Sequence, residues 1–190
     1  MDKKSGWMNP LGKIEEEFSD LPQEYIVYLE TSAENSFEIS TLIVKYLSEK
    51  NDKGIIVSAN RPYTNLLSVY QQNNIDTSKM LILDCLSKSQ HADTPNENVV
   101  FIDNLSALTD ISLSIDEKMR KLEGKKFIFF DSLTTMLIHN QPYTLARFIH
   151  NILTKMRLKC VGGVIVSLYD NSHREIRAEI AQLCDKVVKI

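Results

Sequence analysis

Residues 25–58 read YIVYLETSAENSFEISTLIVKYLSEKNDKGIIVS, and two kinds of hydrophobic spacing alternate along them. Tyr25–Leu29 and Gly54–Ser58 are short apolar runs rich in aromatic and β-branched residues, which is typical of buried strands. Between them, apolar residues recur at helical spacing from Ser36 to Lys50. This strand–helix–strand order predicts a right-handed βαβ unit with parallel strands.

The same alternation continues to the end of the chain. Further strands are expected at Met80–Asp84, Asn98–Asp103, Lys126–Asp131, Gly163–Leu168 and Lys186–Ile190. Further helices are expected from Pro62 to Asn73, Thr109 to Leu122, Pro142 to Leu158 and Glu175 to Leu183, with Gly124 as a helix C-terminal cap. An exposed loop is expected at Ser87–Asn98. This order predicts a three-layer α/β/α sandwich with a mainly parallel sheet.

A single domain is expected over residues 23–190, preceded by a docking segment at residues 1–22. Four apolar side chains of that segment share one helical face: Trp7, Leu11, Ile14 and Phe18. The segment therefore packs on this domain or on a neighbouring protein, and both options stay open.

Composition excludes several classes of protein. The chain has 190 residues, of which 43% are hydrophobic and 25% charged, as expected for a folded domain. A net charge of -3 argues against a dedicated nucleic-acid-binding protein. No apolar run approaches the roughly 18 residues of a membrane span. The three cysteines form no CxxC pair and no signal peptide is evident, which indicates a reduced, cytoplasmic protein.

Metal and thiol chemistry find little support in the sequence. The four histidines lack the spacing of metal ligands, so no metal site is expected. Cys160 and Cys184 are interpreted as small buried hydrophobic residues rather than nucleophiles.

The loop after the first strand is where a phosphate-binding loop, GxxxxGK[ST], would lie. Glu30 and Asn35 stand at its two glycines, Ser36 at its lysine and Phe37 at its magnesium-binding hydroxyl. Glu34 adds a carboxylate that would repel a phosphate. The favoured interpretation is that these residues serve the structure, with Asn35 or Ser36 capping the helix and the acids stabilising its N-terminus.

The run Phe127–Asp131 has the form of a Walker B strand, in which four apolar residues end in an acid that holds magnesium. The alternative, which is favoured here, is that Asp131 caps the segment beginning at Ser132. Without a lysine to position phosphates, this strand alone does not indicate an ATPase.

The order and spacing of Tyr25–Leu29, Glu30–Phe37, Ile55–Pro62 and Phe127–Thr134 resemble the RecA-like ATPases, and particularly their KaiC-like branch. The stretches 56–62, 129–134 and 185–190 are similar to small archaeal members described as inactivated. The resemblance implies a RecA-type sheet and, in active relatives, nucleotide sites at subunit boundaries. Where those relatives carry catalytic acids, this chain has Ser58-Ala59-Asn60.

The sequence therefore predicts no catalytic residue, no metal and no cofactor. It predicts a vestigial nucleotide pocket formed by Glu30, Glu34, Asn35, Ser36, Phe37, Asn60, Arg61, Asp131 and Ser132. The leading hypothesis is a non-catalytic pseudo-ATPase that binds a protein partner or itself, as a regulatory or signalling module. One alternative is a weak ATP-binding protein or ATPase completed by Arg61, Lys45 or groups of a neighbouring subunit. The second is a recombinase-like nucleic-acid-binding protein.

Overall fold

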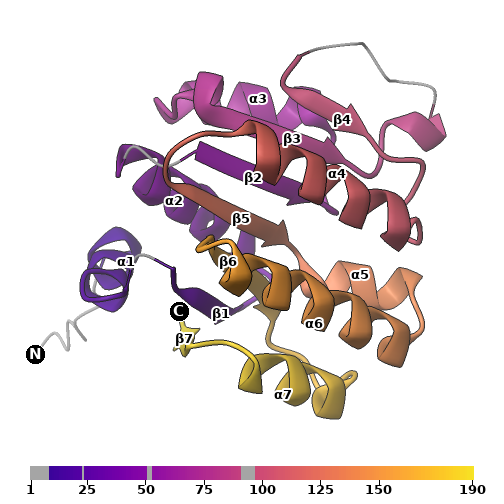
Figure 1. Cartoon of the computed structure of the whole chain (residues 1–190). Helices are drawn as coiled ribbons and strands as arrows, with labels where there is room; N and C mark the ends of the chain where they lie inside the picture. Colours follow the sequence, from indigo (N-terminus) through magenta and orange to yellow (C-terminus); the bar gives the residue numbers. More distant parts are fainter. Residues whose placement is uncertain (1–8, 23, 51–52, 91–96) are drawn as a thin grey trace, which may run out of the picture.

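The sheet has seven strands in the order β4-β3-β2-β5-β6-β1-β7, and every neighbouring pair is parallel. The structure is a computed structural model that describes residues 9–22, 24–50, 53–90 and 97–190. The strands are β1 Ile26–Thr31, β2 Lys53–Ser58, β3 Met80–Asp84, β4 Val99–Phe101, β5 Lys126–Asp131, β6 Gly162–Leu168 and β7 Lys186–Lys189. The expectation of a mainly parallel sheet is confirmed (Figure 1).

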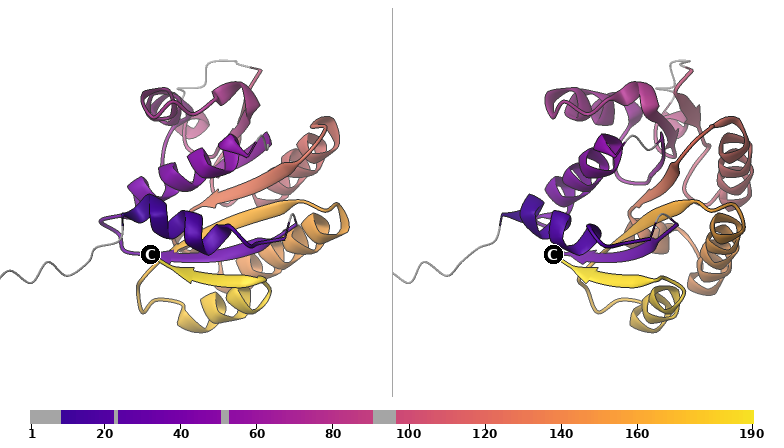
Figure 2. Two further views of the ribbon diagram at one scale, coloured as in Figure 1. Left: turned by 90° about the vertical axis from the view of Figure 1, so that its left-hand side faces the viewer. Right: turned by 60° about the vertical axis from the view of Figure 1, so that its left-hand side comes forward.

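Helices cover both faces of this sheet. They are α1 Pro10–Phe18, α2 Ser36–Glu49, α3 Tyr63–Gln72, α4 Leu108–Lys121, α5 Leu133–His139, α6 Pro142–Leu158 and α7 Arg174–Gln182. The first three pack on one face and the last four on the other, so the predicted three-layer sandwich is confirmed (Figure 2). No helix in the described ranges is long and apolar enough to cross a membrane.

The strands are apolar throughout because both of their faces are buried. Along β1, Ile26 and Tyr28 belong to the core under α4 to α7, whereas Val27 and Leu29 belong to the core under α1 to α3. Successive side chains of a strand point to opposite faces, so a strand covered on both sides shows no polar alternation.

Several boundaries differ from the sequence-based expectation. β1 extends to Thr31, which pairs with Leu168 of β6. Helix α5 was not expected, because its seven residues are too few to show a period. Gly124 does not cap α4: the cap is at Leu122, and Gly124, at φ +81°, lies in the turn before β5. In the predicted loop, Lys88–Gln90 form a 3-10 turn and residues 91–96 lie outside the described residues.

Helix α1 packs against α2 of the same chain. Ile14 and Phe18 are buried, and the Phe18 ring meets the rings of Tyr25 and Tyr46 edge-on at centroid distances of 6.0 and 5.9 Å. Lys13 Nζ also donates a hydrogen bond to the carbonyl of Lys189 in β7. The described part of the N-terminal segment therefore packs on this domain; Trp7 lies outside the described residues.

The close approach of α6 to the sheet depends on Gly163 of β6, which has no side chain. A Cβ atom there would lie 2.3 Å from Met156 Cε and 2.9 Å from the backbone oxygen of Ile128. We expect Gly163→Ala to lower the free energy of unfolding by about 1–3 kcal/mol in urea titrations, through overpacking. Gly12→Ala is the control: its Cβ meets no atom within 4 Å, and this helical site should gain about 0.5–1 kcal/mol. Equal stability of Gly163→Ala and the parent would contradict this packing.

Candidate functional site

At two points the carboxyl ends of adjacent strands lead into helices on opposite faces of the sheet. The chain leaves β1 through α2 on one face and β6 through α7 on the other, and it diverges in the same way between β2 and β5. Open α/β sheets bind ligands at such switch points. A cluster of polar side chains lies at each of these two points.

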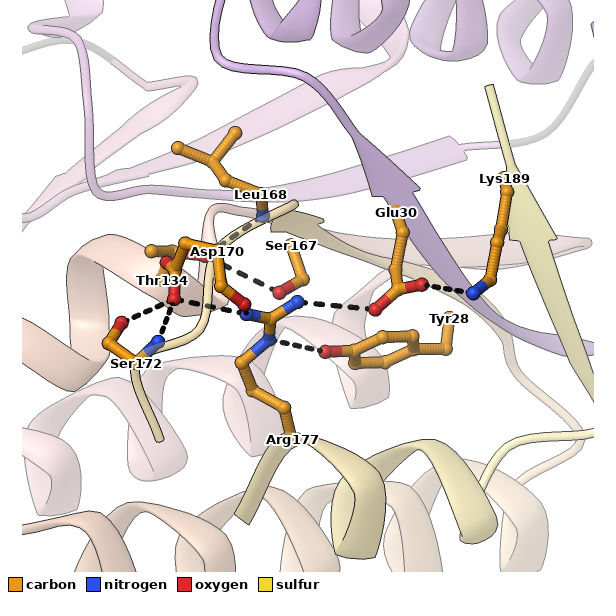
Figure 3. Close-up of polar contacts among 9 residues, drawn as sticks. All are labelled: Tyr28, Glu30, Thr134, Ser167, Leu168, Asp170, Ser172, Arg177 and Lys189. Atoms are coloured by element: carbon orange, nitrogen blue, oxygen red, sulfur yellow. Dashed lines mark hydrogen bonds and ion pairs between the residues drawn. The ribbon is translucent and has the colours of Figure 1, made fainter. Parts of the chain in front are cut away.

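The first cluster is centred on Arg177 of α7, whose side chain is only 7% exposed. Its guanidinium lies 3.2 Å from a carboxylate oxygen of Glu30 and 3.2 Å from one of Asp170 (Figure 3). It also donates a 2.7 Å hydrogen bond to the backbone oxygen of Asp170 and a 3.4 Å bond to the Tyr28 hydroxyl. A buried cation is tolerated only with such partners.

Glu30 joins this cluster to the last strand. Its second carboxylate oxygen lies 3.1 Å from Nζ of Lys189, so both of its oxygens are engaged by cations. Burial raises the pKa of Tyr28, against hydrogen bonds with Ser167 and Arg177 that lower it, and its hydroxyl therefore stays neutral. Glu30, which stands at the first glycine of the phosphate-binding pattern, is thus an internal counter-ion.

The second cluster is centred on Asp131 at the end of β5. Its Oδ1 accepts hydrogen bonds from Asn60 Nδ2 at 3.1 Å and from Ser40 Oγ at 3.4 Å. Burial raises the pKa of Asp131, against the opposing effects of Asn60, Arg61 and Ser40. The predicted capping role of Asp131 is wrong: Ser132 is the N-cap of α5 and accepts from the amide of Thr135 at 3.4 Å.

The Arg61 guanidinium is engaged by an aromatic ring and by an amide oxygen of the same chain. Its guanidinium carbon lies 3.6 Å from the centre of the Phe37 ring, and Nη1 donates to Asn65 Oδ1 at 3.2 Å. A cation over an aromatic face is attracted by the ring quadrupole. Phe37, at the position of the magnesium-binding hydroxyl, therefore holds Arg61 instead.

The loop between the clusters satisfies its polar groups locally. The amide of Asn35 donates to Ser32 Oγ at 3.3 Å, and Ser36 Oγ donates to the carbonyl of Ala33 at 3.1 Å. Asn35 occupies the N-cap position of α2 without a side-chain cap bond, and Glu34 is exposed. At the end of β1, the buried Thr31 hydroxyl has no hydrogen-bond partner within the described part of the chain.

The predicted pocket is therefore divided. Glu30 belongs to the first cluster, whereas Phe37, Asn60, Arg61, Asp131 and Ser132 lie at or beside the second, with Glu34, Asn35 and Ser36 in the loop between. The sequence analysis missed the partners Tyr28, Ser40, Thr135, Asp170, Arg177 and Lys189. Arg177 carried one signal, because it neighbours Ile176 and Ile180 on the buried side of α7.

The cysteines and potential metal ligands lie elsewhere. Cys160 is exposed, contrary to the expected burial, because it occupies the turn after α6 with φ +55°. Cys184 is partly buried. The described residues contain no group of three or more His, Cys, Asp or Glu side chains that could hold a metal ion.

Comparison with known proteins supports the fold alone. No family model matches the chain, and no curated protein matches it. Among solved structures it is similar to a KaiC-like protein from the hyperthermophilic archaeon Pyrococcus horikoshii, with a TM-score of 0.63 and 11% sequence identity. The match covers 89% of this chain and 72% of the other. The RecA/KaiC-like fold expected from the sequence is thereby confirmed.

The buried carboxyl group of Asp131 predicts a pH-dependent effect of Asp131→Asn. Its folded-state pKa is raised above its ordinary value of 3.8, so the parent protein loses stability as pH rises through that raised pKa. The uncharged asparagine has no such loss. The melting temperature of Asp131→Asn relative to the parent should therefore increase from pH 3.5 upward and level off above the raised pKa. A difference that is constant with pH would contradict the assignment.

The first cluster predicts strong coupling between Glu30 and Arg177. Arg177→Met leaves Asp170 without its cation and Glu30 with Lys189 alone, and we expect a loss on the order of 3 kcal/mol in chemical denaturation. In the Arg177→Met variant, Glu30→Gln should lower the free energy of unfolding by about 1–3 kcal/mol less than it does in the parent. Arg174→Met is the control, because this exposed arginine of α7 makes no ion pair among the described residues. Additive losses would show that the pair is not coupled.

Proposed function

We propose that this chain is a non-catalytic pseudo-ATPase with a RecA/KaiC-like fold, acting in the cytoplasm as a regulatory or signalling module that binds protein. The single observation that carries the proposal is the pairing of Glu30 with Arg177 and Lys189. In that pairing, the residue at the start of the phosphate-binding loop is a carboxylate that neutralises the protein's own cations.

The chemistry of phosphoryl transfer supports this proposal. ATP hydrolysis requires cations on the phosphates, a held magnesium ion and an oriented water molecule. The loop Thr31–Phe37 contains no glycine, lysine or arginine, and it carries Glu34. The nearby Arg61 lies on the Phe37 ring, and Asp131 accepts hydrogen bonds from Asn60 and Ser40. Each group that a nucleotide needs is either absent or already engaged.

A binding role accounts for what remains. The chain lacks groups that position a triphosphate, neutralise its charge and activate water. Its function is then to bind another molecule through its surface. The proposal therefore assigns the chain no catalytic residue and no cofactor, and it seeks function in association with protein.

Titration with Mg-ATP and Mg-ADP by calorimetry, with thermal melting in parallel, tests the proposal. We expect no heat of binding and no shift of the melting temperature at millimolar ligand. Binding tighter than about 100 μM, roughly 5.5 kcal/mol, would contradict it and favour the ATP-binding alternative. ATP turnover that is abolished by Asp131→Ala would also overturn it.

A further inference from the structure

Helices α4 and α6 lie on the same face of the sheet (Figure 1). Side chains of the two helices line an open groove on the surface. The groove has a volume of about 580 Å³, with Leu108 and Leu113 on its α4 side and Arg147 and Phe148 on its α6 side. Lys155 of α6 bridges the two helices, with Nζ 2.5 Å from Asp116 and 3.0 Å from Ser112 Oγ. The groove is therefore bounded by two connected helices.

Large apolar side chains project from the same surface. Leu113 is 62% exposed on α4, and Tyr143 is 72% exposed in the first turn of α6. A partner that covers these two side chains would remove their apolar area from water.

The surface also carries one acidic and one basic side chain that form no ion pair among the described residues. Asp110 lies one helical turn before Leu113, and Arg147 lies one turn after Tyr143. Both are exposed, and neither makes an ion pair or a side-chain hydrogen bond with any described residue. By contrast, Lys155 of α6 and Lys159, which caps the C-terminus of α6, both lie within 4.0 Å of Asp116.

We propose that this surface binds a second copy of the chain in a two-fold symmetric dimer. In a two-fold interface each contact occurs twice, so the surface must complement itself. Here it offers a projecting Leu113 and a groove to receive it, together with an unpaired acid and an unpaired base. Asp110 of each copy faces Arg147 of the other, and Leu113 enters the opposite groove.

The size of the surface sets the expected strength of the dimer. Helices of 14 and 17 residues are about 21 and 25 Å long, and a helix pair is about 20 Å wide. Such a face offers on the order of 500 Å² per copy, which is at the lower limit for a specific interface. Interfaces at this limit belong to weak, transient complexes, so we expect the dimer to form only in the upper part of a micromolar concentration series. The dimer deepens the proposed binding role by naming its partner, and it requires no nucleotide.

Sedimentation velocity from 1 to 500 μM protein tests the proposal. The parent should shift from 21.8 kDa toward twice that mass as concentration rises. Leu113→Gln should weaken association at least tenfold, because the side chain that fills the groove is lost. Leu158→Gln is the matched control. Leu158 is an exposed leucine at the end of α6, with 80% of its surface accessible, and it does not line the groove. It should leave the dissociation constant unchanged.

A charge exchange tests the contact itself. Asp110→Arg and Arg147→Asp should each weaken the dimer at least tenfold, because like charges then face each other twice. The double variant restores opposite charges and should return to within about threefold of the parent. Circular dichroism confirms that each variant is folded.

Three results would overturn the proposal: a parent that stays monomeric at 500 μM, an equal effect of Leu158→Gln and Leu113→Gln, or no recovery in the charge-exchanged double variant. The nucleotide titration is independent of these results. Nucleotide binding would reject the pseudo-ATPase while leaving the dimer in place, and a strictly monomeric parent would reject the dimer alone.

Discussion

The buried guanidinium of Arg177 needs negative charge around it, and this need organises the carboxyl end of the sheet. Glu30 comes from β1 and Asp170 from the loop after β6, while Arg177 itself is on α7. Lys189 then ties β7 to the same carboxylate. Because breaking a buried pair leaves an uncompensated charge, these elements are held together. Glu30 cannot be exchanged for the glycine of a phosphate-binding loop without removing a counter-ion from the interior.

The carboxyl group of the second cluster is also engaged within the chain, by neutral hydrogen-bond donors in place of cations. Asp131 receives hydrogen bonds from Asn60 in the loop after β2 and from Ser40 in α2, so its carboxyl group joins these two elements to the end of β5. Arg61 is held by Phe37 on the same side. A triphosphate entering here would have to separate pairs that already satisfy one another, and it would meet no free cation in the loop Thr31–Phe37.

The sheet could be predicted from sequence because strands buried on both faces, such as β1 and β5, are unbroken apolar runs. The short helix α5 could not, since seven residues show no period, and Cys160 was misjudged because its exposure depends on a turn rather than on hydrophobicity. The predicted site residues lie at the carboxyl ends of the strands, but in two separate clusters, and the pairing of Glu30 could not be predicted from the sequence. Its partner Arg177 is 147 residues away, and only the folded sheet brings the two together.

The position of β1 in the sheet also governs how the chain can fold. Its two neighbours are β6 and β7, which follow the other four strands of the sheet in the sequence. At about 5–20 residues per second, ribosomal synthesis leaves this apolar strand without a partner on the order of ten seconds. Pairing between distant segments also pays its loop-closure entropy before it gains contacts, so the final step of folding is slow. While the residues between β1 and β6 are being synthesised, β1 is thus an apolar strand with both of its hydrogen-bonding edges unpaired.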